Sequence, residues 1–320
     1  AWRKRTQHTS WYNETLNTAT RGSRREFPAV AVIVAESSTV TIYDGDDPDL
    51  PMWMVFNQGG SYLASNNLIG TTAGTNSAIS SLNGILSLTT GNEALYLIKF
   101  ISDTSQRITN SANREYLGGI GERNSGKGLS ASNSTNYIVN ANCNDVAMTV
   151  LPSAPIDSAT ELPVPTIAVA TDGGVSIVKD NGTVVDITYN SFGYTKKTHF
   201  TVDNKIAVHT DTNSQTGSRF YRIYEIPSAD LNAGDYNTHT DALRSYGGDG
   251  VLYGYDLRYY WNGSGNWYAP HTIYGKDGPV FGEDNRDRNG IAIISENLNS
   301  PSNGLVCGIS TDCNTGWMHG

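Results

Sequence analysis

The feature of this sequence that most constrains its fold is a recurring phrase: a short apolar strand, a small polar turn and a second apolar strand. The clearest copy, residues 166–188, reads TIAVAT, DGG, VSIVK, DNG and TVVDIT. Asp-Gly and Asn-Gly supply the positive φ angles that tight hairpins need, so the stretch is typical of a β-meander. Further copies lie at 29–45, 84–100, 204–226, 250–261 and 290–309.

The spacing of these copies predicts a β-propeller. The middles of successive first strands, at Ala168, Ala207, Val251 and Ala292, are 39, 44 and 41 residues apart. A period of about 40 residues with several strands per repeat is typical of propeller blades. The gap before Ala168 spans about two periods, so we expect a further blade near 137–148 and about seven blades in all. Because the earliest copies are spaced less regularly, another multi-sheet β arrangement is the alternative.

Composition supports an all-β protein. Of 320 residues, 33 are Gly and 18 are Tyr, and only 17% are charged, which suits many short strands and turns. No segment approaches the roughly 20 apolar residues that cross a bilayer, so we expect no membrane insertion. We expect a basic N-terminal arm over residues 1–25 and a β-propeller-like domain over residues 26–320, as part of a longer polypeptide.

The arm of residues 1–25 carries six basic residues and one acid, in a chain of net charge −9. Such an arm pairs with nucleic acid or with an acidic neighbouring subunit. Trp2, Trp11 and Tyr12 favour the subunit, because they need apolar partners, and we expect no nucleic acid. Burial against its own domain looks insufficient to offset about 1–2 kcal/mol of backbone entropy per residue. We therefore expect the arm to pack on a neighbouring chain or along the propeller's acidic surface, its arginines at 21, 24 and 25 meeting carboxylates.

The sequence contains only incomplete matches to known catalytic and metal-binding motifs. Residues 121–128 fit the G-x-x-x-x-G-K phosphate-binding frame, but Gly128 stands where Ser or Thr would hold magnesium. No G-x-S-x-G nucleophile elbow is present. Cys143, Cys307 and Cys313 lack the spacing of a zinc site, so we expect no metal held by cysteine. The chain is therefore predicted not to be an enzyme, and no cofactor other than calcium is considered.

A loop rich in carboxylates is the candidate calcium site. Asp44, Asp46, Asp47 and Asp49 lie within six residues, between two strand-like runs. Calcium takes several carboxylate and carbonyl oxygens from one loop, so these four residues are candidate ligands. The alternative, which the neighbouring Pro48 favours by stiffening the connector, is a turn whose aspartates satisfy its own backbone amides.

Aromatic residues provide the candidate binding site. Tyr259, Tyr260, Trp261, Trp267 and Tyr268 flank a polar hairpin tip that reads NGSGN. Flat rings beside a polar loop stack on sugar faces or anchor a protein interface. The alternative is that alternate rings fill the space between blades.

Three phrases carry a family resemblance: residues 27–56, residues 165–188 and the terminal NTGWMHG. They resemble large virion proteins of tailed bacteriophages, especially marine ones, in which a blade-repeat region is joined to lectin-like modules. The resemblance implies a tail fibre or another virion appendage, located in the extracellular particle. It carries no catalytic motif, and no lectin module is visible in this chain.

The leading hypothesis is a non-enzymatic structural and adhesion component of a phage virion, which presents or spaces host-contacting parts. Its partners would be other virion proteins or copies of itself, together with a host-surface glycan. One alternative is a carbohydrate-active propeller enzyme, a glycosidase or lyase with paired carboxylates near its channel. Another is a secreted surface propeller that binds a protein.

Overall fold

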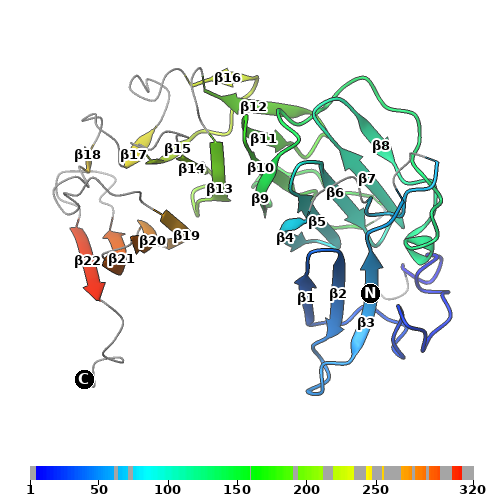
Figure 1. The fold of residues 1–320 in the computed structure, drawn as a ribbon. Helices are drawn as coiled ribbons and strands as arrows, with labels where there is room; N and C mark the ends of the chain where they lie inside the picture. The colour runs from blue at the N-terminus through cyan, green and yellow to red at the C-terminus, as the bar shows by residue number, and fades with distance from the viewer. Residues whose placement is uncertain are drawn as a thin grey trace. The chain divides into compact units, whose positions relative to one another are not determined.

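The computed structural model of the chain has an all-β fold (Figure 1). It describes residues 5–60, 64–70, 75–158, 160–189, 194–211, 219–233 and 243–246, and the backbone of strands between 254 and 311. Within these residues the strands form five sheets, and a short 3-10 helix, η2, spans Ile120–Glu122. No helix in the described part is long and apolar enough to cross a membrane.

The five sheets begin one after another along the chain, although β16 joins sheet 3 after sheet 4 has begun, and most neighbouring strands are antiparallel and consecutive. Sheet 1 contains β1 (Ala31–Ala35), β2 (Thr39–Asp44) and β3 (Met52–Asn57). Sheet 2 contains β4 (Asn76–Leu82), β5 (Ile85–Thr90), β6 (Ala94–Lys99), β7 (Thr104–Ile108) and β8 (Asn113–Glu115).

The remaining strands make three further sheets. Sheet 3 contains β9 (Cys143–Thr149), β10 (Thr166–Thr171), β11 (Gly174–Val178) and β12 (Val184–Thr188), with β16 (Leu231–Asn232) parallel to β12. Sheet 4 contains β13 (Tyr194–Phe200), β14 (Ile206–Asp211), β15 (Arg219–Tyr224), β17 (Arg244–Tyr246) and β18 (Gly254–Tyr255). Sheet 5 contains β19 (Tyr268–Gly275), β20 (Gly278–Asn285), β21 (Arg288–Ser295) and β22 (Leu305–Thr311).

The chain divides into two compact units. Unit 1 comprises Ala1–Asp172 and Ser176–Asp186, and unit 2 comprises Gly173–Val175 and Ile187–Gly320. Sheets 1 and 2 belong to unit 1, and sheets 4 and 5 belong to unit 2. The boundary passes through sheet 3, of which β9 and β10 lie in unit 1.

Sheet 2 has an apolar layer on each face, because consecutive side chains of a strand point to opposite sides. On the side of sheet 1, Leu86 and Leu88 of β5 pack in a core that includes Trp53. On the other side, Leu95 and Leu97 of β6 pack with residues of β9 and β10 from sheet 3. These leucines are at most 3% exposed, so sheet 2 is the middle layer of a three-sheet stack.

Within each unit, the first strands of successive sheets lie beside one another. In unit 1, β4 contacts both β1 and β9, and in unit 2, β13 contacts β19. The β4–β5 hairpin that begins sheet 2 closes on Asn83 and Gly84, whose φ angles are 51° and 77°. Positive φ at both central residues is the two-residue turn that the Asn-Gly pair favours.

A β-bulge in β4 aims two neighbouring side chains at different sheets. Asn76 pairs with Thr90 and Ala78 with Thr89, so Ser77 is the extra residue of the bulge. The Asn76 amide donates to the carbonyl of Glu36 at 2.6 Å, in the turn that links β1 and β2. The Ser77 hydroxyl donates to the carbonyl of Cys143 in β9 at 3.0 Å. The two side chains thus tie β4 to sheet 1 and to sheet 3.

The basic segment before residue 25 packs on its own unit, so the expectation that burial against its own domain is insufficient is wrong for the part described. Trp11 is fully buried in the core of sheets 1 and 2, and its indole nitrogen donates to the carbonyl of Phe100 at 2.7 Å. Its ring packs edge-on against Phe27, Trp53 and Phe100. One large aromatic residue supplies far more apolar burial than the count of apolar residues suggested. Trp2 lies outside the described residues.

Buried arginines fasten the same segment. Arg123 donates to the carboxylate of Glu14 at 2.8 Å and to the carbonyls of Thr20 and Val55 at 2.6 Å. Arg21 is also fully buried and lies over the ring of Trp53. Burial lowers the pKa of Arg21 to about 10, although the Glu14 carboxylate opposes this shift. Of the arginines expected to meet carboxylates, Arg21 lies 3.6 Å from Glu14 and Arg24 lies 2.8 Å from Asp44, both within unit 1.

The described residues contain five sheets where the spacing predicted about seven blades. Residues 143–149, expected to belong to a separate blade, form β9 and pair with β10 in sheet 3. The copies at 204–226 and 250–261 both contribute strands to sheet 4. The recurring phrase counts hairpins, and sheet 4 takes strands from two copies of it, so the period of the phrase is not the period of the sheets.

Candidate functional site

The aspartates of the candidate calcium loop surround an arginine. One guanidinium nitrogen of Arg24 lies 2.8 Å from each carboxylate oxygen of Asp44 and 2.7 Å from Oδ2 of Asp46. Asp46 also accepts the backbone N–H groups of Ala29 and Val30, each at 2.9 Å. These backbone donors, followed by Arg24, hold the pKa of Asp46 below its ordinary value. The hydrogen bond to Asp44 is the main cause of a raised Arg24 pKa.

The other two aspartates of the loop are exposed. Oδ1 of Asp47 accepts the backbone N–H of Asp49 at 3.0 Å, which is an Asx turn of the kind the sequence left open. Among the described residues, no three His, Cys, Asp or Glu side chains are grouped so as to hold a metal ion. A calcium ion in this loop would have to displace the Arg24 guanidinium from Asp44 and Asp46.

Most of the aromatic hairpin lies outside the described residues. Tyr259, Tyr260, Trp261 and Trp267 fall in that part, and only the backbone of Tyr268 is described, at the start of β19 and paired with Asp284. The hairpin therefore stays a prediction. Of the cysteines, Cys143 is buried between sheets 2 and 3, and this burial raises the pKa of its thiol to about 12.

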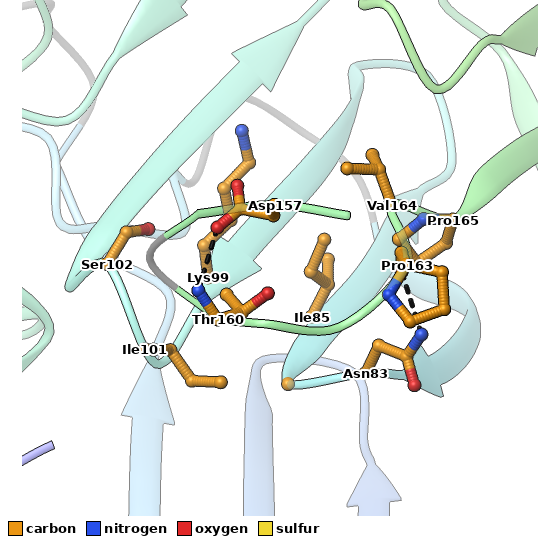
Figure 2. A pocket seen from close by; sticks show the side chains of 11 residues that line it. Asn83, Ile85, Lys99, Ile101, Ser102, Asp157, Thr160, Pro163, Val164 and Pro165 are labelled. Carbon is orange, nitrogen blue, oxygen red and sulfur yellow. Dashed lines mark hydrogen bonds between the residues drawn. The ribbon is translucent and has the colours of Figure 1, made fainter. Parts of the chain in front are cut away.

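A small pocket opens where the β4–β5 turn meets the loop before β10 (Figure 2). Its volume is about 80 Å³, which leaves room for a few water molecules or one small polar group. The polar lining includes Lys99, Ser102, Asp157 and Thr160, and the apolar lining comes from Ile85, Ile101, Pro163, Val164 and Pro165.

Hydrogen bonds hold the loop against the turn. The Asn83 amide donates to the carbonyl of Pro163 at 2.8 Å, and the backbone N–H of Thr160 donates to Oδ1 of Asp157 at 2.8 Å (Figure 2). The Lys99 ammonium donates to the side-chain oxygen of Gln106 at 3.1 Å. The pocket is therefore built from groups that already have structural partners.

The electrostatics of the pocket centre on Lys99. Burial lowers the pKa of its ammonium, while the carboxylates of Glu115 and Asp157 partly offset that effect. One ammonium and two carboxylates carry a net charge of about −1, so the group repels anions. The pocket therefore suits water or a small polar molecule better than an anion.

Sequence reasoning did not find this pocket, although one signal was available. The Asn83-Gly84 pair specifies a hairpin whose two-residue turn joins Leu82 to Ile85, and Lys99 pairs with Ile85 on the next strand. The position of Lys99 near the turn therefore follows from the sequence. Asp157 comes from a long loop, and no local pattern indicates where that loop folds.

Comparison with known proteins identifies no family. No protein-family model and no curated protein matches the chain. The extracellular domain of a hybrid two-component system from B. thetaiotaomicron has a TM-score of 0.38 and 11% identity, over 92% of this chain and 35% of that one. A Bacteroides uniformis protein described as a 6-phosphogluconolactonase has a TM-score of 0.42 and 12% identity, over 90% of this chain and 70% of that one.

A third solved structure is similar to the same degree. It is the extracellular domain of a one-component system from B. thetaiotaomicron, with a TM-score of 0.31 and 11% identity over 86% of this chain and 33% of that one. The chain thus spans about a third of the length of both B. thetaiotaomicron domains. At these TM-scores none of the three supports a statement about function.

Proposed function

We propose that the sheets are blades of a propeller-like scaffold. In both units, the first strands of successive sheets lie side by side, as innermost strands do around a propeller axis. The meander order within sheets 1, 2 and 5 is also that of blades. Five blades, one for each described sheet, replace the seven expected from the spacing of hairpins.

The scaffold serves as a non-enzymatic structural and adhesion component of a phage virion. The observation that carries this proposal is the three-sheet stack of unit 1. The side chains of Asn76, Ser77 and Arg123 form hydrogen bonds that hold it together, which is a structural role. A rigid stack with paired or covered strand edges suits a particle exposed outside the cell. The resemblance of residues 27–56 and 165–188 to phage virion proteins suggests that this particle is a phage virion.

The proposed partners are other virion proteins or copies of the chain, and a host-surface glycan. We assign the glycan contact to the aromatic hairpin around Trp261 and Trp267, since flat rings stack on sugar faces. The pocket beside Lys99 is too small for that role, because typical ligand pockets have about 300–1,000 Å³.

The test is mass spectrometry of gradient-purified phage particles from the sample that carries the gene. Peptides of the chain should sediment with the particles at a constant ratio to a capsid protein. Peptides found only in the soluble or cell-bound fractions would refute the virion assignment. Release of reducing sugar from host polysaccharide by the purified chain, in the absence of other proteins, would refute the non-enzymatic assignment.

A further inference from the structure

Two Asn-Gly pairs lie in turns whose side chains the structure describes, and their surroundings differ. Asn83-Gly84 joins β4 to β5, and Asn181-Gly182 lies between β11 and β12. Asn181 and Gly182 are exposed, whereas Asn83 and Gly84 are half-buried. A Cβ atom added at Gly84 would lie 3.0 Å from the side chain of Ile101, but one added at Gly182 would meet no atom of the described residues within 4 Å. The same dipeptide is therefore packed at one turn and open at the other.

An asparagine that precedes glycine loses its side-chain amide without the help of an enzyme. The backbone nitrogen of the glycine gives up its proton and attacks Cγ of the asparagine, the bond from Cγ to Nδ2 breaks, and the amide leaves with that proton as ammonia. Water then opens the resulting five-membered succinimide at either carbonyl, which gives aspartate or isoaspartate. Glycine favours the attack because it has no Cβ to hinder the approach of its backbone. Such asparagines are among the thermolabile residues of proteins.

The hydrogen bonds of Asn181 prepare its amide for this attack. Its Oδ1 accepts the backbone N–H of Thr183 at 3.0 Å and the Thr183 hydroxyl at 2.7 Å. Both donors draw electrons from Cγ and stabilise the negative charge that develops on Oδ1 when the nitrogen adds. The Asx turn also folds the side chain over the backbone of the next residue, which keeps Cγ near the attacking nitrogen.

The side chain of Asn83 is held away from the reaction. Its Nδ2 group, which would have to leave as ammonia, donates to the carbonyl of Pro163 at 2.8 Å (Figure 2). That bond fixes the side chain on the loop before β10, so Cγ reaches the next backbone nitrogen only after the loop opens. At Asn181 the bond that must break is the one from the Gly182 N–H to the carbonyl of Lys179, at 2.9 Å. This turn is exposed, so water replaces that bond at little cost.

We infer that Asn181 is a site of spontaneous deamidation in the folded chain, and that Asn83 is protected from it. The reaction takes up one water, releases one ammonia and adds a negative charge to a turn that already carries Asp180. An aspartate at this position keeps an oxygen for the Thr183 donors, so the turn survives. An isoaspartate instead inserts an extra carbon atom into the backbone between β11 and β12. The turn between these strands therefore changes in charge and in backbone length as the protein ages.

The experiment follows both asparagines by mass spectrometry of peptides from the purified full chain, incubated at mildly alkaline pH to favour loss of the backbone proton. In the folded chain we expect Asn181 to react about 10-fold or more faster than Asn83, because the protected side chain must first be released by local opening. In urea the two sites should react at similar rates. Thr183→Val removes the hydroxyl donor, keeps the shape and should slow the reaction of Asn181 about 2- to 10-fold. Thr183→Ser, the matched control, should react like the wild type.

Each alternative result has a defined meaning. Equal rates at Asn181 and Asn83 in the folded chain overturn the inference, and so does an Asn181 that reacts in urea but not in the folded chain. A Thr183→Val variant that reacts as fast as the wild type overturns the part given to the hydroxyl. If that variant loses its circular dichroism signal, the comparison of the two asparagines in the unchanged chain still decides. The inference does not rest on the virion assignment, because the reaction is measured on the isolated chain.

Discussion

Sheets 1 and 2 are built from similar strands, yet they differ in what covers them. Sheet 2 packs against another layer on each face, and its central leucines are at most 3% exposed. Sheet 1 is covered on one face, while Val32 and Val34 on the other are about 40% exposed. An alternating apolar pattern specifies a strand with a buried face, but a strand apolar on both faces specifies two neighbours. Unit 1 thus supplies two covering layers to sheet 2 and one to sheet 1.

The covered face of sheet 1 should be the most sensitive part of unit 1. Trp11→Ala removes a fully buried ring that packs against Phe27, Trp53 and Phe100, so we expect a loss of about 3–5 kcal/mol in the free energy of unfolding. Urea unfolding followed by circular dichroism measures it. A loss below about 1 kcal/mol would mean that the N-terminal segment is not part of the core.

The two faces of the stack can be compared directly. Leu95→Ala opens a cavity between sheets 2 and 3 and should cost about 2–5 kcal/mol of unfolding free energy. Val34→Ala on the exposed face should cost less than about 1 kcal/mol, because the side chain is 40% exposed. Equal costs for the two variants in dilute solution would show that the face of Val34 is covered by the chain itself.

The hydrogen bonds of β4 should contribute less than the leucines. Ser77→Ala removes the bond to the Cys143 carbonyl and should lower the unfolding free energy by about 1 kcal/mol. Ser81→Ala, at a position of the same strand that is exposed like Ser77, is the control. Hydrogen exchange should also speed up in β9 for the first variant alone, and unchanged exchange there would contradict a link between the sheets.

The smallest effect should come from the Arg24 cluster. The pKa of Asp46 is lowered in the folded chain, so its contribution to stability is present above the unfolded pKa of about 3.9 and is lost as the pH falls through the folded value. Arg24→Gln removes one cause of this shift and keeps the two backbone donors. The variant should therefore lose less stability than the wild type between pH 6 and pH 3, in thermal unfolding followed by circular dichroism. Arg5→Gln, which removes an exposed pair with Glu161, is the control.

Much of the fold follows from local sequence. The Asn-Gly and Asp-Gly turns at residues 83–84 and 172–174 and the alternation around them predict the hairpins of sheets 2 and 3, because backbone conformation and face are decided within a few residues. The number of sheets does not follow, since nothing local says where one sheet stops and the next begins. Tertiary packing decided that β9 joins β10 rather than a separate blade.

The candidate sites show the same division. The aspartate loop was visible in the sequence, but its occupant, Arg24, lies twenty residues away and is brought in by the chain's path. The role of Trp11 was misjudged because burial depends on Phe100, 89 positions later in the chain. Lys99 and Asp157 meet through a loop that carries no periodic pattern. Contacts that depend on long-range packing are those that local patterns leave out.

Because of the bulge at Ser77, the packing of β4 against its two neighbouring sheets depends on the exact number of residues in the strand. Side-chain direction in a strand alternates strictly, so one residue more or less reverses every direction upstream of it. Because Ser77 is that one residue, deleting it would turn Asn76 away from the Glu36 carbonyl while also removing the bond to Cys143. A single deletion would thus uncouple both neighbouring sheets at once.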